Sequence, residues 1–164
     1  MQIKILIVED DSDIQALLKE MLLLHSPNCS IDMHISPRKA IVAIEHKSYD
    51  IVISDMGLVD SWVGGDSVLE AAKKSGCFTV LYSGINGNCS PCDFKLPKVL
   101  DATKIDRLFS AYEKYTQSPE YLKVSEGKYK NQLKKQLQKM GIRVIGNYVC
   151  KKDVLKLLNE RMHR

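Results

Sequence analysis

The sequence predicts an α/β protein built on a parallel sheet with crossover helices. Over residues 1–109, short apolar runs alternate with segments of helical period, which is the pattern of such a sheet. The chain of 164 residues is 45% apolar and 27% charged, enough for one full core and a smaller unit. No apolar run approaches the roughly 18 residues that a bilayer crossing needs. We therefore expect a soluble, cytoplasmic protein with no membrane partner.

The predicted elements follow one another along this first part of the chain. Apolar runs predict strands at residues 3–8, 31–35, 51–53, 79–82 and 94–96. Helical periodicity and capping residues predict helices starting near Asp13, at Ser36–Pro37, before Val68 and near Ile105. Residues 84–92 are rich in helix breakers, so we expect a loop there instead of a regular fourth helix.

Acidic side chains follow two of the predicted strands. Glu9 and Asp10 come directly after the first strand, and Asp55 follows the third. Ligands of parallel sheets bind at the carboxyl ends of strands where the strand order reverses, so we expect these carboxylates to converge. Clustered carboxylates repel one another unless a hard cation joins them, and Mg²⁺ suits such a site. With the hydroxyl of Ser83 and a nearby lysine, the site could stabilise a phosphoryl group in transfer.

Three segments of the chain stand at characteristic intervals. They are Ile5–Asp11, Tyr49–Leu58 and Val80–Gly84. Asp55 lies 45 residues after Asp10, and Ser83 lies 28 residues after Asp55. In order and spacing they resemble the signatures of the receiver domain of bacterial two-component response regulators. The resemblance covers residues 1–115 and implies a flavodoxin-like, doubly wound sheet of five parallel strands, with the fourth helix short or missing.

The resemblance also implies roles for individual residues. Asp55 would accept a phosphoryl group from a sensor histidine kinase or a histidine phosphotransfer protein. Asp10 would ligate Mg²⁺ directly, Glu9 mainly through water, and Asp55 and the Gly57 carbonyl would complete the protein ligands. Ser83 would be the hydroxyl that moves to the phosphoryl oxygen. Such a domain is no enzyme in the usual sense, because it catalyses only its own phosphorylation and dephosphorylation, and homodimers are common in the family.

The chain departs from the family where a phosphate-facing lysine is expected. The family has Lys-Pro at the end of the fifth strand, whereas Pro97-Lys98 stands here, only 15 residues after Ser83. We interpret Lys98 as the phosphate-facing lysine. In an alternative register, Ile142–Val149 is the last strand, Asn147 replaces the lysine and a long insertion precedes it. The aromatic switch residue of the family is also unmatched, since Lys95 stands three residues before Lys98.

Residues 116–164 form a second predicted unit, which is small, basic and α+β. Residues 110–164 carry 13 Lys+Arg against 5 Asp+Glu, net +8, whereas residues 1–109 carry 11 against 15, net −4. Periodicity predicts a helix over 128–140, a strand over 142–149 and a helix over 153–162. Residues 123–142 also resemble the turn and second helix of helix-turn-helix proteins. DNA binding through residues 120–164 therefore stands beside a protein-binding or dimerising role.

The cysteines point to a reducing compartment. Their number is five, an odd count, and they are scattered along the chain. Cys89 and Cys92 have the spacing of half a zinc site or of a redox pair. Without a second pair, we interpret them as two thiols in a loop.

Two functions of different classes remain open. In the first, Asp55 is phosphorylated and the C-terminal unit transmits the signal. In the second, the protein is a pseudo-receiver, a protein-interaction module in which the fold persists without phosphorylation.

Overall fold

The chain divides into two compact units, Met1–Tyr121 and Leu122–Arg164. The computed structural model describes residues 2–60, 63–84, 92–119, 121, 134–135, 137–145 and 148–149. The predictions made for Cys89, Asn147 and the helix over 153–162 fall outside these residues, as does most of the connection predicted to lack a helix. No helix of the described ranges has the length and apolar character needed to span a membrane.

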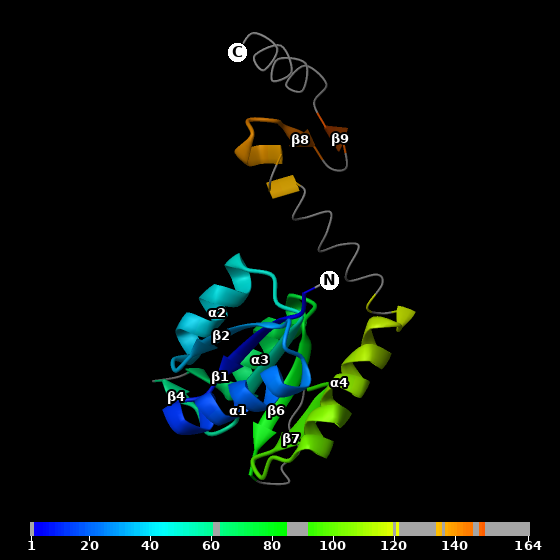
Figure 1. Cartoon of the computed structure of the whole chain (residues 1–164). Helices are drawn as coiled ribbons and strands as arrows, with labels where there is room; N and C mark the ends of the chain where they lie inside the picture. The colour runs from blue at the N-terminus through cyan, green and yellow to red at the C-terminus, as the bar shows by residue number, and fades with distance from the viewer. Residues whose placement is uncertain are drawn as a thin grey trace. The chain divides into compact units, whose positions relative to one another are not determined.

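Five parallel strands form the central sheet of the first unit, in the order β2-β1-β3-β6-β7 (Figure 1). They are β1 (Lys4–Val8), β2 (Ser30–His34), β3 (Ile51–Asp55), β6 (Phe78–Ser83) and β7 (Phe94–Pro97). The predicted α/β, flavodoxin-like fold is confirmed, and the strand ends differ from the predicted ones by at most two residues. The strand order reverses between β1 and β3, which places a crevice at their carboxyl ends.

Helices cover both faces of this sheet (Figure 1). They are α1 (Ser12–His25), α2 (Pro37–His46), α3 (Gly65–Lys74) and α4 (Ala102–Thr116). Ile5 and Ile7 of β1 belong to one buried cluster with residues of α1 and α4, and Leu6 and Val8 belong to another with residues of α2 and α3. Strand β1 is therefore buried on both faces, which explains why it reads as a continuous apolar run.

The helix starts are set by side chains that cap the first turn. Asp11 Oδ1 accepts hydrogen bonds from the amides of Asp13 (2.9 Å) and Ile14 (3.1 Å), and Asp101 Oδ1 accepts one from the amide of Lys104 (2.9 Å). In α2, Ser36 is the cap and proline occupies the first turn, as predicted. Helix α3 is different, because its N-cap residue is a glycine without a side-chain bond.

A short hairpin that the sequence did not predict follows β3. Strands β4 (Val59–Asp60) and β5 (Val63–Gly64) pair in antiparallel fashion between β3 and α3. Valines favour the extended backbone, and this preference prevails over the surrounding glycines and polar residues.

Ten residues, 84–93, join β6 to β7, whereas parallel strands usually need a longer crossover. Hydrogen bonds of Asp93 connect the start of β7 to β6. Its Oδ2 accepts hydrogen bonds from the amide (2.9 Å) and the hydroxyl (2.7 Å) of Thr79, and its own amide donates to the Thr79 carbonyl (2.9 Å). Lys73 of α3 pairs with the other carboxylate oxygen. These bonds fix the register in which Pro97 lies opposite Ser83.

We expect Asp93→Ala to lower the free energy of unfolding by about 1–3 kcal/mol, because the buried Thr79 hydroxyl would lose its acceptor. Urea unfolding followed by circular dichroism measures the change. Lys73→Met is the control, because it removes only the half-exposed ion pair and should cost less than about 1 kcal/mol. Equal losses in the two variants would mean that the ion pair, and not the buried hydrogen bonds, holds β7.

The first unit continues past the end of α4, where aromatic side chains contact one another. Tyr115 packs edge-on against Tyr121, with ring centroids 5.2 Å apart, and contacts Phe78 of the sheet. The amide of Tyr121 also donates to Ser118 Oγ (3.1 Å). The compact unit consequently ends at Tyr121.

Within the second unit, the described helical residues end at Lys139, and Gly141 lies in the turn that follows. This glycine has φ of 76°, and the amide of Ile142 donates to the Leu137 carbonyl (2.9 Å), as at many helix C-termini. The strand predicted over 142–149 is instead a hairpin of β8 (Val144–Ile145) and β9 (Tyr148–Val149). This hairpin is a separate sheet, so β7 and not this segment is the fifth strand of the first unit, and the alternative register is wrong.

Candidate functional site

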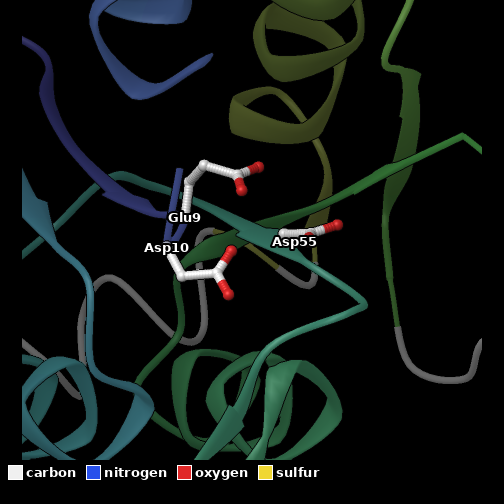
Figure 2. A group of neighbouring side chains, drawn as sticks. All are labelled: Glu9, Asp10 and Asp55. Carbon is white, nitrogen blue, oxygen red and sulfur yellow. The ribbon is translucent and has the colours of Figure 1, made fainter. Parts of the chain in front are cut away.

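Three carboxylates converge at the crevice. Glu9 and Asp10 follow β1 directly, and Asp55 is the last residue of β3 (Figure 2). One oxygen from each carboxylate lies within 4.8 Å of the others. Glu9 and Asp55 are only 1% and 5% exposed, whereas Asp10 is exposed. The site therefore holds two buried carboxylates and a third at the surface.

Main-chain contacts fix the position of Glu9. Its amide donates to the His34 carbonyl at the end of β2 (3.2 Å). The buried Gln15 of α1 donates from Nε2 to the carbonyls of both Glu9 (3.3 Å) and His34 (3.2 Å). Sequence reasoning missed Gln15, although a polar residue on the apolar face of the first helix was a usable signal.

Lys98 lies directly beside the carboxylates. Its Nζ is 3.1 Å from Asp55 Oδ2 and 3.3 Å from Glu9 Oε2. The Lys98 amide donates to the Ser83 carbonyl (3.3 Å), which continues the pairing of β6 and β7 by one residue. The short connection thus brings the residue interpreted as the phosphate-facing lysine into contact with Asp55.

The surroundings shift the protonation of two of these groups. Burial, followed by the charge of Asp55, raises the pKa of Glu9 above its usual value. Burial alone would lower the pKa of Lys98, but the hydrogen bond to Asp55 and the charges of Asp55 and Glu9 raise it. Three carboxylates face one ammonium, so the site has excess negative charge.

We expect stability to depend on pH through Glu9. A carboxyl whose pKa is raised in the folded state binds more protons there than in the unfolded chain, so stability falls as pH rises from the ordinary pKa of 4.5 through the raised pKa. Glu9→Gln should remove this fall and stabilise the cation-free protein at neutral pH. Thermal melts between pH 4.5 and 8 in chelator measure the effect. A wild-type melting temperature that rises steadily with pH over that range would contradict it.

The donor set fits a hard divalent cation. Glu9 Oε2 is in ion-pair contact with Lys98, but among the described residues no hydrogen bond of good geometry reaches it. Oxygens from three carboxylates lie close enough to share one ion, and the exposure of Asp10 leaves one side open to water. Mg²⁺ takes a few carboxylate oxygens and keeps several waters, which matches this arrangement.

A pocket of about 400 Å³ opens beside Asp55. It is lined by Asp55, Met56, Gly57, Leu81, Ser83, Gly84 and Lys98. The predicted phosphoacceptor, hydroxyl and lysine therefore line one cavity. A Cβ on residue 57 would lie 3.2 Å from Asp55 Oδ2, so glycine at this position keeps the carboxylate accessible.

Comparison with solved structures links this arrangement to a known fold. A two-component response regulator from Clostridium difficile is 26% identical, with a TM-score of 0.60, over 71% of this chain and 100% of that one. A CheY-like receiver domain from Methylobacillus flagellatus is 24% identical, with a TM-score of 0.59, over 68% and 99% of the two chains. The N-terminal unit has the fold of a CheY-like receiver domain. Another CheY-like receiver domain, from Methanospirillum hungatei JF-1, is 17% identical over 71% and 98%, with a TM-score of 0.61.

The resemblance seen in the sequence is therefore confirmed, and the receiver-domain fold supports a response-regulator role. No protein-family model matches the chain, and no curated protein matches it. All three structural comparisons cover about 70% of the chain, so they describe the receiver domain and leave the basic unit aside.

One residue of the receiver domain's site escaped sequence reasoning because it acts through its backbone. A Cβ on Gly65 would lie 1.9 Å from the Asp55 carbonyl oxygen. The first turn of α3 therefore packs directly on the end of β3. The Gly64-Gly65 pair at the start of the helix was the available signal, but two adjacent glycines by themselves indicate only a loop.

The N-terminal unit also departs from the receiver-domain pattern on its fifth strand. Lys95 is exposed there, and the half-buried Phe94 packs into the core shared by α1 and α4. Tyr82, a buried aromatic residue of the neighbouring strand β6, pairs with Leu96 in the sheet, and its ring centroid lies 5.5 Å from Lys98 Nζ.

Proposed function

We propose that the chain is a cytoplasmic response regulator whose Asp55 accepts a phosphoryl group from a histidine kinase or a histidine phosphotransfer protein. One observation carries this proposal: Asp55, Ser83 and Lys98 line one pocket, with Lys98 Nζ 3.1 Å from Asp55 Oδ2. We assign the chain no reaction on other substrates, only its own phosphorylation and dephosphorylation.

In the proposed reaction, a carboxylate oxygen of Asp55 attacks the phosphorus atom of a phosphohistidine. An O–P bond forms while the P–N bond breaks, and the imidazole nitrogen leaves with the electron pair. Lys98 compensates the negative charge of the phosphoryl oxygens beside Asp55, and the Ser83 hydroxyl donates to a phosphoryl oxygen. Glu9, Asp10, Asp55 and the Gly57 carbonyl would hold Mg²⁺, which neutralises phosphoryl charge when bound.

Intact mass measured after incubation with phosphoramidate tests this proposal. In Mg²⁺ the protein should gain the mass of one phosphoryl group, and in EDTA it should gain none. A protein that stays unmodified both with phosphoramidate and with a phosphorylated histidine kinase would favour the pseudo-receiver.

We propose further that the basic C-terminal unit transmits the signal. Residues 110–164 carry a net charge of +8, and the side chains of Lys135, Lys139 and Arg143 are exposed. This charge favours a polyanionic partner such as DNA over an uncharged one.

Duplex binding by the full chain, measured at several salt concentrations, tests this output. We expect affinity to fall with salt. The double variant Lys135→Gln/Lys139→Gln should reduce the slope of log affinity against log salt by about 0.9 for each phosphate that it no longer neutralises. Weak duplex binding by the full chain, with a salt slope that the double variant leaves unchanged, would favour a protein partner or self-association.

A further inference from the structure

Tyr82 contacts Lys98 at two points. The ring centroid of Tyr82 lies 5.5 Å from Lys98 Nζ, within the range of a cation–π interaction. The Tyr82 hydroxyl donates a long hydrogen bond, 3.5 Å, to the Lys98 carbonyl. Tyr82 is itself only 1% exposed, so its ring is a fixed surface. Both the ammonium and the main chain of Lys98 therefore rest against one buried side chain.

Lys98 needs such support because it lies just beyond a short edge strand. Strand β7 has four residues, of which only Leu96 is fully buried. The next residue after Lys98, Val99, is 78% exposed. The Lys98 side chain is 31% exposed, and its flexible four-carbon stem has many alternative rotamers. Strand packing alone therefore holds the ammonium weakly.

The strand β6 serves both sides of the site. Tyr82 and Ser83 are consecutive, so their side chains point to opposite faces of the sheet. Tyr82 belongs to the core cluster shared by α1 and α4, whereas Ser83 lines the pocket beside Asp55. Burial, followed by the negative charge of Glu9, raises the pKa of the phenol, so its hydroxyl keeps the proton that it donates.

We propose that Tyr82 is a positioning residue that holds Lys98 against Asp55 and Glu9. The ring attracts the ammonium, and the hydroxyl fixes the main chain from which the side chain extends. This role rests on the proposed phosphoryl transfer for its effect on rate, but the placement of Lys98 can be measured separately.

Nuclear magnetic resonance tests the placement directly in the full chain. A side chain that lies over an aromatic ring has its Hε protons shifted upfield, and Lys98→Arg identifies the resonance. We expect an upfield Hε signal for Lys98 in the wild type, kept in Tyr82→Phe and abolished in Tyr82→Leu. A wild-type signal at the position of an exposed lysine would overturn the proposal, whether or not any variant folds.

The rate of phosphorylation by phosphoramidate in Mg²⁺ tests the consequence. Tyr82→Leu should slow it by about tenfold, a ratio between those expected for the removal of an exposed and of a desolvated cation–π interaction, and Tyr82→Phe should slow it by less. The control is Phe78→Leu, which truncates a buried aromatic residue on the same face of the same strand. It should leave the rate and the Lys98 signal unchanged.

Equal slowing by Tyr82→Leu and Phe78→Leu would overturn the proposal, because it would indicate a general loss of packing. If the wild type takes up no phosphoryl group, the proposed function fails. The Lys98 resonance then still decides whether Tyr82 positions the lysine.

Discussion

Asp55→Asn will abolish uptake of a phosphoryl group from phosphoramidate. The side chain keeps its size, but an amide is not a nucleophile at phosphorus. Asp55 carries the one carboxylate among the described residues that line the pocket with Lys98 and Ser83. Intact mass in Mg²⁺ should show full modification of the wild type and none of the variant. Asp10→Asn is the matched control for the removal of a metal ligand, because it should slow uptake without moving the acceptor. Uptake by Asp55→Asn would mean that another carboxylate of the cluster accepts the phosphoryl group.

The same variant should also weaken the response to cations. An ion that binds only the folded protein stabilises it. When the Mg²⁺ concentration is well above the dissociation constant, this stabilisation grows with the logarithm of that concentration. We expect the melting temperature of the wild type to rise when Mg²⁺ is added. The rise should be smaller for Asp55→Asn, since one of the three neighbouring carboxylates is gone. Identical rises in the two proteins would mean that the ion binds elsewhere.

Gly65→Ala is expected to have the second largest effect, although it adds only one methyl group. That Cβ would lie 1.9 Å from the Asp55 carbonyl oxygen, so either the end of β3 or the start of α3 must move. Overpacking of this kind costs about 1–3 kcal/mol of the free energy of unfolding. Because Asp55 is displaced, phosphorylation should slow as well. Urea unfolding and the rate with phosphoramidate measure the two effects.

Gly84→Ala is the matched control for stability. A Cβ at this position meets nothing within 4 Å, so the free energy of unfolding should change by less than about 0.5 kcal/mol. If Gly65→Ala were as stable as Gly84→Ala, the contact between α3 and β3 would be looser than the structure has it.

The strands and the acidic cluster were predictable because each depends on local sequence. Buried strands of a parallel sheet read as apolar runs, and Glu9, Asp10 and Asp55 stand where such runs end. The reversal of strand order then brings them together without further information. The convergence of the carboxylates follows from these two general rules.

The supporting residues were not predictable in the same way. Gln15, Gly65 and Tyr82 act through contacts with residues outside their own helix or strand, and the residues next to them in the sequence do not indicate these partners. The hairpin after Asp55 was missed because glycines and polar residues around it favour a loop. Lys98 is an intermediate case, since the sequence offered two registers and only the pairing of β7 with β6 decides between them.

The short connection between β6 and β7 bears on how the domain folds. The entropic part of the free energy needed to close a loop grows with loop length, by about 0.6 kcal/mol for each doubling. Folding is also faster when native contacts are close in sequence. The contacts of Asp93 with Thr79 span 14 residues and are therefore local on the scale of the domain. The edge of the sheet that carries Lys98 is therefore suited to form early in folding. Lys98 would then be in place before the more distant strands β1 and β3 close the carboxylate cluster beside it.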